Sequence, residues 1–208
     1  MIEEAYQGAP INHDRGGDQH YDVMSAFCKS LRGSDPDAAL YWLARLIHGG
    51  EDPRYIARRI MVHASEDIGL ADNSALQTAV AAAQAVELIG YPEARIILAH
   101  AALHVCRAPK SNSAYRGINL AMQAVTSEPP AQVPLHLRDT HYKGAEQLGH
   151  KGYASPHKDP RGWLEQEYVP DLQRGRFYQS DARGAGTFEK RADDFLHQVT
   201  GKPPVRKF

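Results

Sequence analysis

The chain has 208 residues, of which 42% are hydrophobic and 24% charged, and its formal net charge is −1. This is enough for one domain with a sizeable core, and the composition is that of an ordinary soluble globular protein. The near-neutral balance argues against a dedicated nucleic-acid-binding arm, because neutralising phosphates needs a surplus of lysine and arginine, although a local basic face is still allowed.

The two cysteines, Cys28 and Cys106, lie in apolar helical patterns, have no metal-type spacing and do not sit at an electropositive helix start. Their small number suits a reducing cytosol. No run approaches the about 18 apolar residues of a membrane span, and the acidic start MIEEAYQGAP is unlike a signal peptide. We therefore expect a cytoplasmic protein with no membrane partner.

The first predicted helix covers residues 18–33, where apolar residues recur at helical spacing and Gly33 ends the pattern. Its start overlaps the stretch HDRGGDQHYD, residues 13–22, whose histidines and aspartates raise the alternative of a metal site. The spacing matches neither a zinc site nor a calcium loop. A glycine turn followed by a helix cap at Asp18 explains more of the stretch.

Two further helices are predicted to start at Asp-Pro pairs, with Asp35 and Asp52 as N-caps and a proline at the first helical position. The former ends at Gly49-Gly50. The latter is expected to run to Gly69, with Ile56, Ile60, His63 or Ala64, and Ile68 on its apolar face.

Three more helices are expected within residues 72–90, 92–109 and 111–130. The first of these is rich in alanine and is expected to be buried on several sides, because small side chains let helices approach closely. Short connections imply antiparallel neighbours.

After Pro130 the chain is rich in glycine, proline, arginine and aromatic residues. We expect one short helix in residues 133–150, short strands in EQEYVP and GRFYQS, and a final helix capped by Thr187. That helix would bury Phe188, Ala192, Phe195 or Leu196, and Val199.

Two patterns resemble catalytic or metal sites without completing them. GAEQLGHK, residues 144–151, nearly matches a phosphate-binding loop, but His150 replaces the lysine, and both the following Ser or Thr and a preceding strand are missing. His100 and His104 are four residues apart, yet Ala101 stands where the zinc-protease motif has glutamate. Buried or interface histidines are the favoured interpretation for these two and for His63. No catalytic, cofactor or metal residue is predicted.

A basic surface is the remaining candidate site. We expect guanidinium groups on the exposed side of the third helix and a basic, hydroxyl-rich loop at the start of the sixth, which could contact DNA or a partner protein. The alternative is a solvated face and an ordinary helix cap. The candidate residues are Arg54, Arg58, Arg59, Lys110, Asn112, Ser113 and Tyr115.

Several long segments carry a family resemblance: GDQHYDVMSAFCKSLRGSDPDAALYWLARLI, DPRYIARRIMVHASEDIGLAD, AVAAAQAVELIGYPEARIILAHA, APKSNSAY and VPLHLRDTHYKGA. They resemble the C-terminal part of the replication-associated recombination protein A family (RarA, also called MgsA), which are bacterial AAA+ ATPases. The resemblance continues more loosely through GYASPHKDPRGWLEQEYVPDLQRGRFYQ and covers nearly the whole chain.

The resemblance implies an all-α antiparallel helical bundle, similar to the collar domain of clamp loaders, followed by an irregular arm and a C-terminal helix. Residues 1–17 would be the tail of the ATPase lid, 18–149 the helical oligomerisation domain, and 150–208 the arm with the terminal helix packed on it. The ATPase core and Walker motifs are missing, so we expect a C-terminal piece of a parent that uses ATP and magnesium.

The resemblance also implies a homotetramer, a nucleoid-associated cytoplasmic location, and DNA and single-stranded-DNA-binding protein as partners of the full-length parent at stalled forks. Two hypotheses follow for this chain. One is an oligomerisation module, because its apolar helical surface exceeds what one layer of helices covers. The other is a DNA- or partner-binding element that uses the basic residues. We do not expect an enzyme.

Overall fold

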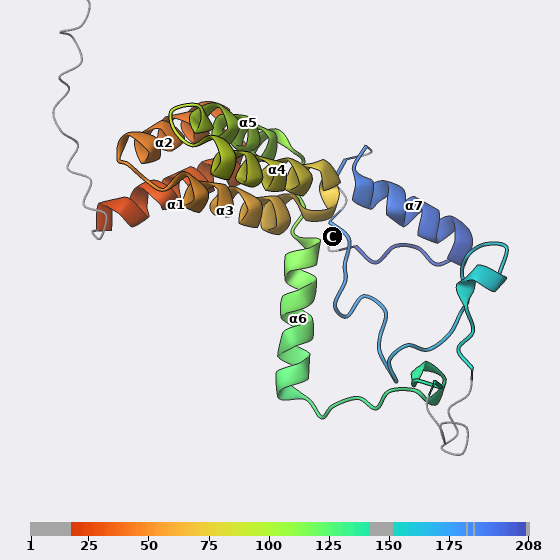
Figure 1. Cartoon of the computed structure of the whole chain (residues 1–208). Helices are drawn as coiled ribbons and strands as arrows, with labels where there is room; N and C mark the ends of the chain where they lie inside the picture. The colour runs from red at the N-terminus through yellow and green to blue at the C-terminus, as the bar shows by residue number, and fades with distance from the viewer. Residues whose placement is uncertain (1–17, 142–151, 182, 185, 207–208) are drawn as a thin grey trace, which may run out of the picture. The chain divides into compact units, whose positions relative to one another are not determined.

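The computed structural model describes residues 18–141, 152–181, 183–184 and 186–206 (Figure 1). The chain divides between Asn112 and Ser113 into two compact units, here called the N-terminal and C-terminal units. The domain boundaries expected from the sequence stay predictions, and their first segment, residues 1–17, lies outside the described residues, as do GAEQLGHK and the beginning of HDRGGDQHYD.

The N-terminal unit is a bundle of five α-helices in which α5 contacts each of the other four (Figure 1). The helices are α1 (Asp18–Gly33), α2 (Pro36–His48), α3 (Pro53–His63), α4 (Asn73–Ile89) and α5 (Ala94–Arg107). A π-helical turn, η1 (Ala64–Ile68), and a 3-10 turn, η2 (Gly69–Ala71), join α3 to α4.

Local capping signals set where these helices begin. The Asp35 carboxylate accepts a hydrogen bond from the Ala38 amide at 3.0 Å, and Asp52 accepts one from the Arg54 amide at 2.8 Å. Asp72 caps α4 in the same way through the Ser74 amide. Each cap satisfies an amide that the helix itself leaves without a partner, which confirms the two predicted Asp-Pro starts.

The third helix ends earlier than the sequence suggests. The α-helical hydrogen bonding stops at His63 and the chain continues as the π-helical turn η1, so Gly69 ends η1 rather than α3. Gly69 has φ +46°, and a Cβ placed on it would lie 3.1 Å from the Ser111 carbonyl oxygen. Glycine is therefore required at this close approach of two backbone segments.

The hydrophobic core of the described residues lies in the N-terminal unit, and its members run from Val23 to Ala108. The predicted apolar face of α3 and η1 is confirmed, with Ile56, Ile60 and Ile68 at most 1% exposed. The expectation that α4 is buried on several sides is wrong. Only one stripe of α4 is buried, because Leu76, Val80 and Leu88 face solvent.

The C-terminal unit contains α6 (Ser113–Ser127), the 3-10 turns η3 (Leu135–Leu137) and η5 (Pro156–Lys158), and α7 (Phe188–Thr200). The described part of this unit has no strand, so the two predicted strands are wrong. GRFYQS contributes only the isolated parallel bridge between Ser180 and Arg206. The short helix expected after Val133 is the single turn η3 as far as residue 141. An all-α fold is confirmed.

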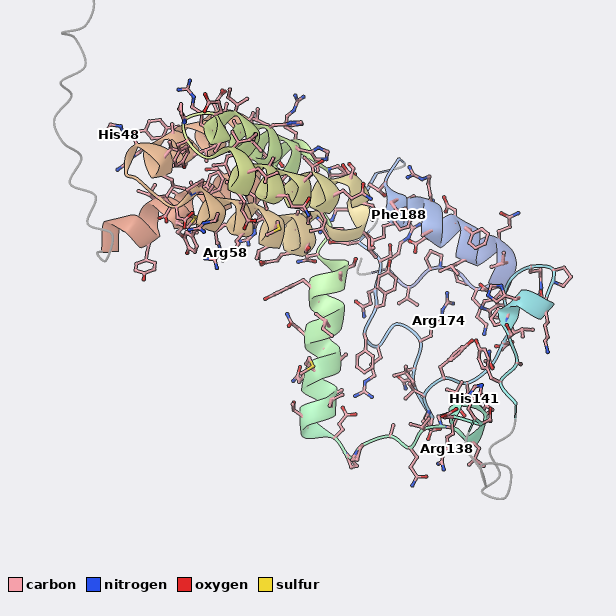
Figure 2. All side chains as sticks on the ribbon, viewed as in Figure 1. His48, Arg58, Arg138, His141, Arg174 and Phe188 are labelled. Atoms are coloured by element: carbon pink, nitrogen blue, oxygen red, sulfur yellow. The ribbon has the colours of Figure 1, made fainter. Side chains whose placement is uncertain are left out.

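The last helix has the predicted cap but not the predicted buried face. Thr187 accepts a hydrogen bond from the Lys190 amide, which starts α7. Phe188 (Figure 2) and Phe195 are exposed, whereas the buried positions are Glu189 and Asp193. Tyr178 donates a hydrogen bond to Glu189 at 3.0 Å, so tertiary contacts of the irregular arm, and not the apolar periodicity, orient this helix.

Candidate functional site

Two of the predicted basic residues do point to solvent on α3. Arg54 is exposed and forms an ion pair with Asp52, its Nη2 lying 2.9 Å from the carboxylate. Arg58 (Figure 2) is exposed too, with its guanidinium carbon 5.3 Å from the centre of the Tyr55 ring. Only these two guanidinium groups match the expected exposed face of α3.

The expectation for Arg59 is wrong. This side chain is half-buried, and its Nη2 lies 3.7 Å from the Cys28 sulfur on α1, while its Nε is buried without a hydrogen-bond partner. The residue lies one position past Arg58, which turns it by about 100° around the helix toward α1. Arg59 therefore serves an interior contact and not an exposed basic surface.

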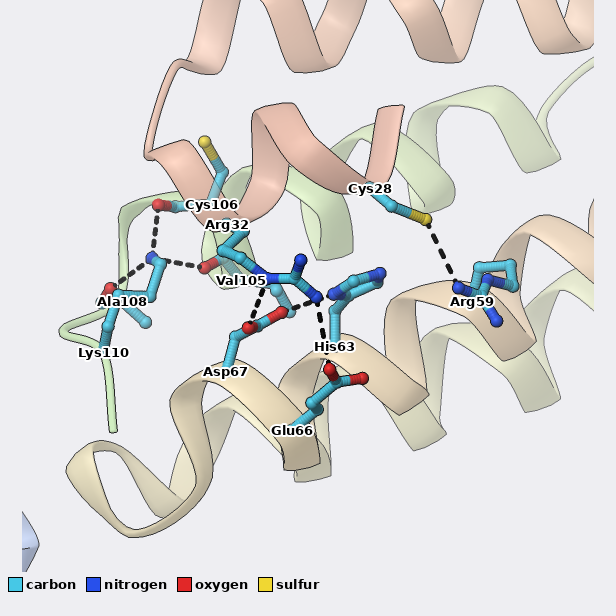
Figure 3. Close-up of polar contacts among 10 residues, drawn as sticks. All are labelled: Cys28, Arg32, Arg59, His63, Glu66, Asp67, Val105, Cys106, Ala108 and Lys110. Carbon is cyan, nitrogen blue, oxygen red and sulfur yellow. Dashed lines mark hydrogen bonds and ion pairs between the residues drawn. The ribbon is translucent and has the colours of Figure 1, made fainter. Parts of the chain in front are cut away.

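Lys110 is placed as a helix cap. Its ammonium donates hydrogen bonds to the carbonyl oxygens of Val105, Cys106 and Ala108 at 3.2, 2.8 and 2.7 Å (Figure 3). All three protons are therefore used at the carboxyl end of α5, where a positive charge also opposes the helix dipole. Burial lowers the pKa of Lys110 from its usual value.

The other three predicted residues have different environments. Asn112 is half-buried at the end of the N-terminal unit, and Ser113 is buried as the first residue of α6. Tyr115 is 47% exposed on α6. The structure thus divides the predicted set into exposed members, Arg54, Arg58 and Tyr115, and members with structural contacts.

A cluster that sequence reasoning missed lies between α1, α3 and η1, and consists of Arg32, His63, Glu66 and Asp67 (Figure 3). Asp67 accepts hydrogen bonds from His63 Nδ1 at 2.5 Å and from Arg32 Nε at 2.7 Å. Arg32 also pairs with Glu66 at 3.2 Å. His63 and Asp67 are four residues apart, and this spacing is the one signal in the sequence that could have found the pair.

The cluster shifts the ionisation of its members. Burial alone would lower the pKa of His63, but hydrogen bonding and charge from Asp67 and Cys28 raise that pKa to about 9. Burial would likewise raise the pKa of Asp67, whereas His63 and Arg32 hold it below its usual value. At neutral pH the cluster therefore holds a buried imidazolium beside a carboxylate.

Among the described residues, no group of three potential metal ligands converges. His104 instead bonds at the start of α4, with Nε2 3.3 Å from Asp72 and 3.1 Å from the Ser74 hydroxyl. His100, for which the sequence favours a buried or interface position, is exposed. None of the helices in the described ranges is long and apolar enough to cross a membrane.

Comparison with known proteins decides the family. The family described as "MgsA AAA+ ATPase C terminal" matches residues 33–199, which is most of the chain. The chain belongs to the MgsA AAA+ ATPase C-terminal family. The match extends across both units, from the end of α1 to the last turn of α7.

Curated relatives agree with this family. Replication-associated recombination protein A of Bacillus subtilis is 47% identical over 206 residues, covering 99% of this chain and 48% of that protein. The protein of the same name from Escherichia coli K12 is 39% identical over 82% of this chain and 39% of its own length. An uncharacterised AAA-domain-containing protein of Mycobacterium tuberculosis is 54% identical over 88% of this chain and 41% of its own length. The chain thus spans about half the length of the MgsA-family proteins it matches.

Proposed function

We propose that this chain is the self-association module of a longer AAA+ ATPase that acts in DNA replication and recombination, without a catalytic site of its own. Membership of the MgsA C-terminal family supports the parentage. The names of the relatives in Bacillus subtilis and Escherichia coli support a role in replication and recombination. Four copies, as the family resemblance implies, are the proposed assembly.

The observation that carries the proposal is the distribution of apolar side chains. All buried hydrophobic residues among those described belong to the N-terminal unit, and the buried side chains of the C-terminal unit are polar or charged. That unit nevertheless holds many large apolar residues at the surface. Since burial of such side chains contributes about 25 cal/mol per Å², a unit that leaves them in water gains stability when a partner covers them.

Helix α6 supplies the most regular apolar surface of the C-terminal unit. Tyr115, Ile118, Met122 and Val125 follow each other at steps of three, four and three residues, and are 47, 58, 54 and 77% exposed. This spacing places them on one stripe of the helix, the pattern by which helices pair in coiled coils. We call these four residues the α6 stripe.

The chemistry of α6 favours a second copy of the chain as the occupant of this stripe. Arg116 is the only charged residue between Ser113 and Ser127, and its guanidinium donates a hydrogen bond to the Gln179 carbonyl oxygen at 3.0 Å. A stripe without charge has no electrostatic preference for a different partner. Identical stripes match each other in size and polarity, as in symmetric homo-oligomers.

The mass of the full chain in solution, measured by light scattering after size-exclusion chromatography, tests the proposal. We expect a mass near four times 23.0 kDa at about micromolar concentration. The double variant Met122→Glu with Val125→Glu should lower the mass. Leu88→Glu is the matched control, because Leu88 on α4 is 87% exposed but lies off the stripe.

Each outcome bears on a separate part of the proposal. A monomeric wild-type chain contradicts self-association. An assembly that survives the double variant, or one that Leu88→Glu dissociates equally, contradicts the assignment to α6. Circular dichroism of each variant separates dissociation from unfolding.

DNA and single-stranded-DNA-binding protein are the proposed partners of the longer protein. Direct contact of this chain with DNA is the second candidate, and the exposed guanidinium groups of Arg54 and Arg58 favour it. Titration of labelled single-stranded DNA at two salt concentrations tests this candidate against the variant Arg54→Gln with Arg58→Gln. Binding that falls steeply with salt and weakens in the variant supports it, and no binding at low salt contradicts it.

A further inference from the structure

Three ionisable side chains from two helices lie close together, and one of them, His63, also belongs to the cluster around Asp67. Cys28 lies on α1, and Arg59 and His63 lie one turn apart on α3. Arg59 Nη2 is 3.7 Å from the Cys28 sulfur (Figure 3). The imidazole of His63 lies next to this pair, with its Nδ1 already bonded to Asp67 (Figure 3).

The second ring nitrogen of His63, Nε2, would be stabilised by a negatively charged partner. His63 is 1% exposed, and its Nε2 is buried without a hydrogen-bond partner. Because Nδ1 bonds to a carboxylate, the protonated ring carries a second N–H on Nε2 that water does not reach. A thiolate at Cys28 would accept from this donor, and a buried donor left without an acceptor is unfavourable.

The charges around the sulfur favour the same state. The cationic groups that face the site are Arg59 and His63 on α3 and Arg32 on α1, and Lys110 lies beyond Asp67. The anionic groups are Asp67, which bonds to both Arg32 and His63, and Glu66, which bonds to Arg32. Burial alone would raise the pKa of the Cys28 thiol, but His63 and Arg59 lower it below its usual value.

We propose that Cys28 is an oxidation site: a thiolate held by His63 and Arg59 that reacts with hydrogen peroxide. Sulfur attacks one peroxide oxygen, so the S–O bond forms as the O–O bond breaks. The departing hydroxide takes the Nε2 proton of His63 and leaves as water. Sulfur is oxidised by two electrons to a sulfenic acid, the peroxide is reduced, and His63 becomes neutral.

The low exposure of Cys28 limits which reagents can react with it. The residue is 7% exposed, so a reagent for its sulfur has to be small, as hydrogen peroxide and iodoacetamide are. Cys106 is an internal reference in the same unit. It is fully buried on α5, and its pKa is raised by burial. The two cysteines therefore have opposite environments in one chain, and only one of them has cationic neighbours that outweigh burial.

Alkylation of the full chain by iodoacetamide, followed for each cysteine by peptide mass spectrometry, measures the ionisation of both thiols. We expect Cys28 to react about tenfold faster than Cys106 near neutral pH. The alkylation rate of Cys28 should reach half of its maximum at a pH below about 8.5, the pKa of a free thiol. After exposure to hydrogen peroxide and then unfolding in urea, which removes the limit on access, dimedone should label Cys28 and not Cys106.

Two variants test the roles of the neighbours. Arg59→Gln and His63→Gln should each raise the alkylation midpoint of Cys28, by about 1 pH unit, because each removes a nearby positive charge. His48→Gln, at an exposed position of α2, is the matched control and should leave the midpoint unchanged. Arg59→Gln keeps the test valid if His63→Gln fails to fold.

The proposal is overturned if Cys28 reacts no faster than Cys106, if its midpoint is at or above that of a free thiol, or if neither variant moves the midpoint. The same holds if peroxide leaves Cys28 without a dimedone label. None of these results depends on the mass of the chain in solution, so this proposal and the proposed self-association fail or succeed independently.

Discussion

His63 and Asp67 form a buried hydrogen bond of 2.5 Å across the point where the α-helical geometry of α3 gives way to the π-helical turn η1. Both residues are at most 9% exposed. The same carboxylate bonds to Arg32 on α1, so the turn is fixed to a helix more than 30 residues earlier in the chain.

The first prediction concerns the stability that the buried pair provides. His63→Gln removes the imidazolium and leaves Asp67 with Arg32 as its remaining charged partner. We expect the free energy of unfolding in urea to fall by about 2 kcal/mol, since breaking a buried pair leaves a charge that is poorly compensated. His48→Gln, an exposed position, should change it by less than about 0.5 kcal/mol. Equal effects of the two variants would contradict the role of the pair.

The second prediction is the pH dependence of that difference. The folded-state pKa of His63 is about 9, above the usual value of 6.5. Protonation therefore stabilises the folded state, and this stabilisation is fully present below about pH 6.5 and lost as the pH rises through about 9. The difference in unfolding free energy between wild type and His63→Gln should shrink over that window. A difference that grows with pH would show that His63 is neutral in the folded protein.

The third prediction concerns the backbone at Gly69. Alanine there meets both a φ of +46° and the Ser111 carbonyl oxygen at 3.1 Å. We expect Gly69→Ala to lower the unfolding free energy by about 1–2 kcal/mol, and the melting temperature with it. Gly33→Ala is the control, because a Cβ at Gly33 has no atom within 4 Å. If both substitutions are neutral, the close approach at Gly69 is not a constraint.

The fourth prediction separates structure from DNA contact at Lys110. Lys110→Met keeps the aliphatic length but removes three hydrogen bonds to the end of α5. We expect a loss of about 1–2 kcal/mol of unfolding free energy, whereas Lys29→Met at an exposed position of α1 should have little effect. Any DNA binding of the chain should keep its salt dependence in Lys110→Met. A smaller salt slope would assign the ammonium to phosphate contact.

The sequence by itself determined the helical class and most helix starts in the N-terminal unit. Asp35 and Asp52 are N-caps because a short carboxylate before proline satisfies amides within three residues, an interaction that needs no distant partner. The apolar periodicity of α3 likewise predicted which side of the helix is buried. Both features depend on residues within a few positions of each other, so the sequence pattern alone predicts them.

Only the tertiary structure decided what the polar residues do. Arg59 turns toward Cys28, and Lys110 binds the end of α5, although both look like surface cations in the sequence. In α7 the buried residues are Glu189 and Asp193, against its apolar periodicity. The physical reason is that a hydrogen bond or ion pair depends on which groups folding brings within about 3 Å. Residues close together in the sequence are enough to form a helix cap. Arg32 and Asp67, in contrast, come within hydrogen-bonding distance only after α1 packs against α3.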